Sequence, residues 1–73
     1  MNATASVTIL VNDQSREVGP GDTLAALVGR MGLAGRAGIA AAVNDGVVPR
    51  REWENRALAA GDRVLLIQAA QGG

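Results

Sequence analysis

The sequence predicts an α+β fold in which a mixed sheet of four to five strands packs one face against a single main helix. Short β-rich runs alternate with clusters of Asn, Asp, Gly and Pro, which is typical of strands joined by tight turns. Only residues 24–31 carry apolar side chains at helical spacing. With 73 residues, the chain has room for one small domain with a thin core.

The first part of the chain predicts a β-hairpin. Residues 7–11 form a β-rich run, residues 12–15 are a polar turn cluster, and residues 16–18 are typical of a returning strand. The Gly-Pro-Gly sequence at residues 19–21 then ends the hairpin.

A helix of about ten residues is expected next, because apolar residues spaced i, i+3, i+4, i+7 form one stripe on a helix. The stripe consists of Leu24, Leu27, Val28 and Met31. Asp22 or Thr23 is suited to accept hydrogen bonds from the first N–H groups of this helix. At the other end, Gly32 followed by Leu33 predicts a C-terminal cap with the glycine at positive φ.

The second half predicts three more strands. Residues 39–43 and 47–48 flank an Asn-Asp-Gly turn, and residues 64–67 form the last apolar run. Between them, residues 50–58 have room for a helical turn around Trp53. The first and last strands are best placed at the centre of the sheet, where they lie parallel and the helix forms the crossover. This arrangement is the β-grasp, or ubiquitin-like, architecture.

These elements divide the chain into three segments. We expect residues 1–6 to be a disordered N-terminal extension, residues 7–68 to form the β-grasp domain, and residues 69–73 to be a flexible tail. A ferredoxin-like domain would need a second helix, and residues 51–58 are too short and too poorly periodic to form one.

Side chains alternate between the two faces of a strand, and both faces of this sheet are apolar. The row expected to face the helix consists of Val7, Ile9, Val11, Ile39, Ala41, Val43, Val64 and Leu66. The opposite row consists of Leu10, Ala40, Ala42, Leu65 and Ile67, where a solvated face would carry polar residues. We interpret this second row as a docking surface for another protein. The alternative is that single exposed aliphatic residues are ordinary on small proteins.

The composition excludes several classes of function. Seven acidic residues balance seven basic residues, which argues against a nucleic-acid-binding module. The chain contains no His, Cys or Lys, so it lacks the commonest general base, the usual zinc ligands and a Schiff-base amine. No apolar run approaches the ~20 residues of a membrane helix. We therefore expect a cytoplasmic protein with no bound cofactor or metal and no nucleic-acid or membrane partner, and we do not expect a self-sufficient enzyme.

The sequence ends with Gln71, Gly72 and Gly73. Glycine has no Cβ, so a Gly-Gly end is thin enough to enter a narrow channel in another enzyme. The reactive group would then be the carboxylate of Gly73. Because a carboxylate is a poor electrophile, it would need activation, for example by transfer of AMP from ATP. The alternative is a frayed end without any chemistry.

Several motifs of the second half occur together in one known family. They are Ala42-Val43-Asn44, Val47-Val48-Pro49-Arg50 with Trp53, Leu58, Gly61-Asp62 with Val64, and the final Gln71-Gly72-Gly73. With them the chain resembles the ThiS family, the sulfur carriers of thiamine biosynthesis, whose pattern runs AVNG-x-VVPR-x-x-W, L-x-x-GD-x-V and QGG. The chain departs from this pattern at Asp45, where the family usually has glycine, at Leu65, where a charged residue is common, and at Ala70, where a larger aliphatic residue is common.

The resemblance implies a β-grasp carrier that holds no catalytic residue of its own. A ThiF-like adenylyltransferase would use ATP to adenylate the carboxylate of Gly73. A sulfur donor system would convert the adenylate to a thiocarboxylate, and a ThiG-like thiazole synthase would take the sulfur for thiazole formation.

Three other functions remain open from the sequence. A sulfur carrier like the small subunit of molybdopterin synthase has a similar tail but lacks the VVPR-x-x-W pattern. A ubiquitin-like protein modifier would end as an isopeptide on its targets. A plain adaptor would use no tail chemistry at all.

Four further residues have two interpretations each. We expect Trp53 to cover the core rather than to stack on a ligand, and Asp62 to stabilise a turn rather than to act in catalysis. Arg50 and Arg51 either meet acidic groups on a partner or belong to a solvated loop.

Overall fold

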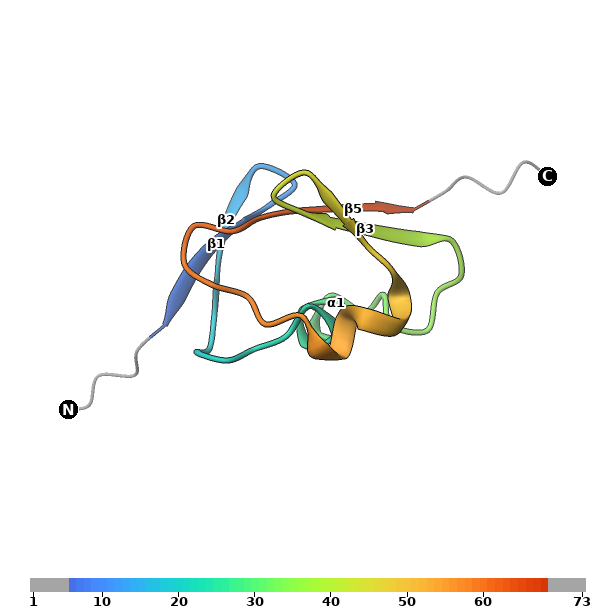
Figure 1. Cartoon of the computed structure of the whole chain (residues 1–73), viewed down its shortest axis with the longest axis horizontal. Coiled ribbons are helices and arrows are strands. Elements are labelled where there is room, and N and C mark those ends of the chain that lie inside the picture. Colours follow the sequence, from blue (N-terminus) through green and yellow to red (C-terminus); the bar gives the residue numbers. More distant parts are fainter. Residues whose placement is uncertain (1–5, 69–73) are drawn as a thin grey trace.

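The computed structural model describes residues 6–68 and confirms a mixed five-stranded sheet with one main helix on one face (Figure 1). The elements in chain order are β1 (Val7–Val11), β2 (Gln14–Val18), α1 (Leu24–Arg30), β3 (Ile39–Val43), β4 (Gly46–Val48), the 3-10 helix η1 (Arg50–Asn55) and β5 (Arg63–Gln68). The expected tail at 69–73 and all of the expected extension except Ser6 lie outside the described residues. Ser6 donates a hydrogen bond of 2.9 Å from Oγ to Glu17 Oε1.

The strand order in the sheet is β2-β1-β5-β3-β4. The neighbours β1 and β5 are parallel, with Leu10 opposite Arg63 and Val11 opposite Val64. All other neighbouring strands are antiparallel. The parallel pairing of the first and last strands is therefore confirmed, and α1 lies in the connection between them, as a parallel pair requires.

Both hairpins turn through two residues with positive φ, which is the type I′ geometry that matches the twist of the strands. The residues are Asn12 (50°), Asp13 (69°), Asn44 (52°) and Asp45 (73°). The second turn differs from the expected Asn-Asp-Gly turn, because Gly46 already belongs to β4. Asp45 adopts the left-handed backbone at the position where the family pattern has glycine, and a short polar side chain tolerates this conformation.

Helix α1 begins and ends at capping residues. Thr23 Oγ1 accepts a hydrogen bond of 3.2 Å from the Ala26 N–H. At the C-terminus, Gly32 has φ 76° and the Leu33 N–H donates to the Val28 carbonyl at 3.0 Å, a Schellman cap. This cap makes α1 seven residues long, shorter than the ten expected. Among residues 6–68, no helix is long and apolar enough to cross a membrane.

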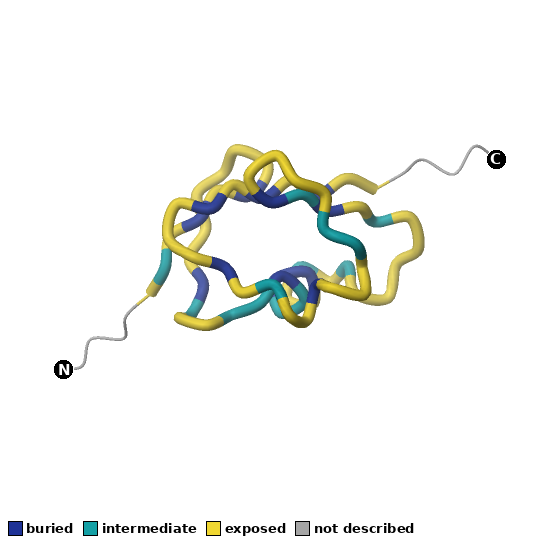
Figure 2. The backbone as a smooth tube through the Cα atoms, viewed as in Figure 1, coloured by how far each residue is buried: buried dark blue, intermediate teal, exposed yellow. Residues whose placement is uncertain are grey.

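The core lies between α1 and the inner face of the sheet (Figure 2). The row predicted to face the helix is buried, except for Val7 and Ile39, which are half-buried. Trp53 is also buried, and its Nε1–H donates a hydrogen bond of 2.9 Å to the Val48 carbonyl. The prediction that Trp53 covers the core is confirmed, because η1 carries its indole against α1 and the core.

Candidate functional site

The outer face of the sheet, on the side away from α1, carries the apolar row that the sequence predicts there. Leu10, Leu65 and Ile67 are large hydrophobic residues that expose 37%, 49% and 53% of their surface. Ala40 is exposed and Ala42 is half-buried. The exposure of this row is thus largely confirmed. Its role in docking is not tested by exposure alone and stays a prediction.

The four residues on β3 and β5 form one continuous surface, because they lie opposite one another on adjacent strands. Ala40 on β3 is opposite Ile67 on β5, and Ala42 is opposite Leu65. Leu10 on β1 is opposite Arg63, two residues before Leu65. Cross-strand partners on one face of a sheet have Cβ atoms about 4.5–5.5 Å apart, which is contact distance for aliphatic side chains. We call this set of five residues the outer patch.

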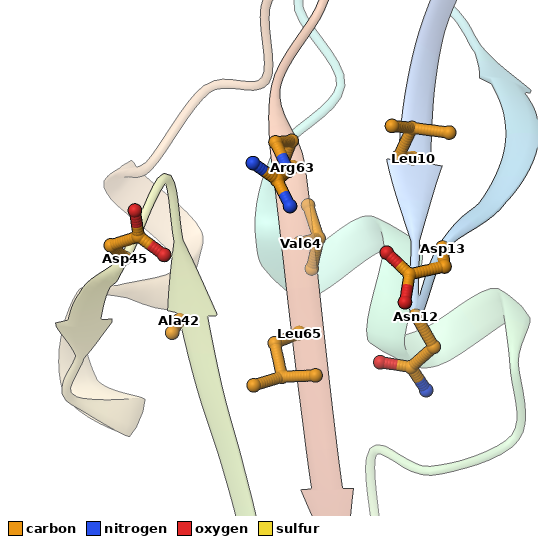
Figure 3. A pocket seen from close by; sticks show the side chains of 8 residues that line it. All are labelled: Leu10, Asn12, Asp13, Ala42, Asp45, Arg63, Val64 and Leu65. Atoms are coloured by element: carbon orange, nitrogen blue, oxygen red, sulfur yellow. The ribbon is translucent and has the colours of Figure 1, made fainter.

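One end of the outer patch is hollowed, as the close view shows (Figure 3). The hollow has a volume of about 370 Å³. Its lining consists of Leu10, Asn12, Asp13, Ala42, Asp45, Arg63, Val64 and Leu65. Because Asp13 and Asp45 lie on either side of Arg63, the hollow combines an apolar floor with a rim of alternating charge.

The charges on this rim are available to a partner. Among residues 6–68, the one ion pair within 4 Å joins Arg30 to Asp22, far along the chain from the hollow. Asp13, Asp45 and Arg63 are all exposed, so water screens them strongly. A partner with an anionic group between two cationic groups would complement this rim.

Two asparagines position β5 at the hollow. Asn12 Oδ1 accepts a hydrogen bond of 2.9 Å from the Leu66 N–H, and Asn44 Oδ1 accepts one of 3.0 Å from the Arg63 N–H. Asn44 Nδ2 in turn donates to the buried carboxylate of Asp62 at 2.9 Å. The same carboxylate accepts the Ala59 N–H at 2.8 Å, so the predicted turn role of Asp62 is confirmed.

Arg50 and Arg51 do not join the outer patch. Both belong to η1, which packs against α1 on the other side of the sheet. Arg50 Nη2 donates 2.9 Å to the Arg36 carbonyl, and its guanidinium lies 5.0 Å from the centre of the Trp53 ring. Arg50 therefore supports the loop before β3 and the Trp53 side chain that covers the core, whereas Arg51 is exposed.

The expected reactive group, the carboxylate of Gly73, lies outside the described residues together with Gln71 and Gly72. The last described strand, β5, carries Ile67 of the outer patch and ends at Gln68, five positions before Gly73 in the sequence. Within residues 6–68 there is no group of three or more side chains suited to hold a metal ion.

The sequence analysis missed the polar part of the hollow. It treated Asn12 and Asp13 only as a turn, and it gave no role to Arg63. A signal was nevertheless present, because both hairpins have the same Asn-Asp pair at their turns. Each pair follows a strand that runs beside β5, so the Asn44-Asp45 pair lies at the start of β5 and the Asn12-Asp13 pair lies beside its middle, on the other side.

The comparisons with known proteins agree with the motifs and with the fold. The sequence matches the ThiS family over residues 8–73. It is 37% identical over 65 residues to the sulfur carrier protein ThiS of Escherichia coli (strain K12), which covers 89% of this chain and 97% of that protein. The structure is similar, with a TM-score of 0.78 and 19% identity, to the crystal structure of the thiamine biosynthesis protein ThiS from Geobacter metallireducens, covering 92% of this chain and 100% of that chain. The fold is thus the expected β-grasp, and the chain belongs to the ThiS family.

Proposed function

We propose that the protein is a sulfur carrier of thiamine biosynthesis whose Gly73 carboxylate becomes a thiocarboxylate and donates sulfur for thiazole formation. The observation that carries this proposal is the family match, which runs through the final Gln71-Gly72-Gly73. The related protein of Escherichia coli, a sulfur carrier by name, supports it at 37% identity over nearly its whole length.

The chemistry needs two steps, a substitution at the α-phosphorus of ATP and then a substitution at the terminal carbonyl carbon. A carboxylate oxygen of Gly73 attacks the α-phosphorus of ATP and expels pyrophosphate, which leaves a mixed anhydride with AMP. A donor at the oxidation level of sulfide then attacks the carbonyl carbon and expels AMP. The product is the thiocarboxylate, whose sulfur is nucleophilic enough to be passed on.

The folded body supplies binding rather than catalysis in this proposal. With no His, Cys or Lys in the chain, the adenylating activity belongs to a ThiF-like partner that binds ATP, and sulfur transfer belongs to a donor system and a ThiG-like synthase. The outer patch is the docking surface best suited to these partners, because it is apolar, continuous and in line with the strand that precedes the tail.

Intact mass tests the proposal. The protein is mixed with the adenylating enzyme, ATP and sulfide, and we expect a mass gain equal to the replacement of one oxygen by sulfur. A variant lacking Gly72 and Gly73 should show no gain while it keeps the same unfolding transition. Sulfur uptake by the truncated variant would contradict the proposal, and conjugates that survive denaturant and reductant would favour a protein modifier instead.

A further inference from the structure

The second half of β5 has an edge that no strand of the described chain covers. Along a strand, successive residues direct their backbone groups to opposite neighbours. The Arg63 carbonyl accepts a hydrogen bond from the Asn44 N–H. The backbone N–H and C=O groups of Arg63, Leu65 and Ile67 therefore point toward β3. The Asp62 carbonyl accepts a hydrogen bond from the Leu10 N–H, and the Val64 carbonyl accepts one from the Asn12 N–H. The backbone groups of the even-numbered residues of β5 therefore point toward the β1 side.

Pairing on the β1 side stops halfway along β5. The parallel register ends with Val11 opposite Val64, and the chain then turns away at Asn12. The Asn12 side chain satisfies one more group, the Leu66 N–H. Among residues 6–68, no strand follows to pair with the Leu66 carbonyl and the Gln68 N–H, although β3 still pairs with β5 as far as Gln68.

We call the unpaired edge of β5 at residues 66–68 the notch. It differs from the two outer edges of the sheet, which are formed by β2 and β4. Natural sheets protect edges with charged residues, proline or very short strands. The β2 edge carries Arg16 and Glu17, and the β4 edge is three residues long and is followed by Pro49. The notch at residues 66–68 is equally short but carries neither a charged residue nor proline, and Ile67 within it is apolar and exposed.

We propose that the notch at residues 66–68 accepts an extended segment of the enzyme that activates the Gly73 carboxyl, as an added strand beside β5. The occupant follows from continuity, because β5 leads into the tail and any enzyme that holds Gly73 must lie alongside the chain that precedes it. Leu65 and Ile67 of the outer patch flank the notch, so one partner covers both surfaces. Main-chain pairing gives affinity in such strand additions, and side-chain pockets give specificity. This inference rests on the proposed function.

A proline substitution tests the notch selectively. Gln68→Pro removes the N–H that faces the notch, and it spares the β3 ladder because that N–H faces away from β3. Gln68→Ala is the matched control, which loses the same side chain and keeps the N–H. We expect Gln68→Pro to weaken binding of the adenylating enzyme about two- to twelvefold relative to Gln68→Ala, the range for one net hydrogen bond. Thermal unfolding of both variants checks that the fold is intact.

Hydrogen exchange of the unmodified protein gives a second measurement. The Gln68 amide should exchange rapidly in the free chain and at least tenfold more slowly in the complex. Equal affinities of the two variants, or a Gln68 amide that stays unprotected in the complex, would overturn the added strand. Failure of the unmodified protein to accept sulfur would instead overturn the proposed function, so the two failures are distinguishable.

Discussion

The two faces of the sheet are built from the same kinds of residue but differ in what covers them. On the inner face, Leu66 keeps 8% of its surface exposed beneath α1, while its neighbour Leu65 keeps 49% on the outer face. Both are leucines in the middle of β5. Residue type alone therefore does not decide which of these side chains is buried. The position of α1 and of Trp53 decides it.

We expect the inner face to contribute to stability and the outer patch to contribute to binding. Burying apolar surface contributes about 25 cal/mol per Å², and the inner face has already gained this free energy on folding. The large side chains of the outer patch still expose 37–53% of their surface, so part of that contribution remains for association with a partner. Substitutions on the inner face should therefore lower the free energy of unfolding, and substitutions on the outer patch should lower affinity.

The largest effect is expected at Trp53, which covers the inner face. Trp53→Ala should lower the free energy of unfolding by about 3–5 kcal/mol, because it opens a cavity and leaves the Val48 carbonyl without its indole partner. Urea unfolding measures this change, and the slope of the transition should stay constant. A change below about 1 kcal/mol would mean that Trp53 does not cover the core.

Leu65 and Leu66 allow the most direct test of the difference between the two faces. Leu66→Ala should cost about 2–4 kcal/mol of unfolding free energy, whereas Leu65→Ala should cost under about 1 kcal/mol. Affinity for the adenylating enzyme should show the opposite order, with Leu65→Ala the weaker binder. Unfolding curves and titration calorimetry on the same two variants measure both quantities.

The same two variants can also contradict this distinction between the inner face and the outer patch. If Leu65→Ala binds as tightly as the unmodified chain, the outer patch is not the docking surface. If both variants lose equal stability, the two faces are not distinct in energy.

The smallest effect is expected beside α1, away from both faces of the sheet. Arg30 donates a hydrogen bond of 2.7 Å to Asp22 and holds the pKa of that carboxyl below its usual value, with further help from the Gly19 N–H. A lowered pKa in the folded state stabilises the protein above the ordinary aspartate pKa near 3.8, and this contribution is lost as the pH falls through the folded pKa. Asp22→Asn should thus be slightly less stable than the unmodified chain at pH 7.

Unfolding experiments over a pH series check this expectation. The stability difference between Asp22→Asn and the unmodified chain should shrink as the pH falls below 3.8 and through the lower folded pKa, because the carboxyl is neutral in both states only below that folded pKa. A difference that grows in acid would have the wrong sign for a lowered pKa.

Local signals in the sequence predicted most of the fold. The caps at Thr23 and Gly32 fixed the ends of α1, and the alternation in Ile39–Val43 and β5 assigned side chains to the correct faces. These features depend on residues close together in the chain, so spacing reveals them. The family motifs then suggested the proposed chemistry of the Gly73 tail, which no periodicity can reveal.

Contacts between distant residues escaped the sequence analysis. Asn12 bonds to Leu66 across 54 positions, and the Arg50 guanidinium bonds to the Arg36 carbonyl across 14 positions that include β3 and β4. Neither contact leaves a periodic pattern, because each depends on how the finished sheet and helices are placed. The notch beside residues 66–68 likewise depends on where β1 turns away from its neighbour.

The central position of β5 has a mechanical consequence. If the proposed function holds and an enzyme binds the tail, any tension on the tail would act on β5, which is bonded to β1 on one side and to β3 on the other. Ladder hydrogen bonds lie across the strand axis, so they carry such tension together in shear instead of unzipping one after another. Resistance to forced unfolding is set by the unfolding rate, and loading in shear keeps that rate low. The body can therefore stay folded under traction that would peel off a strand at the rim of the sheet.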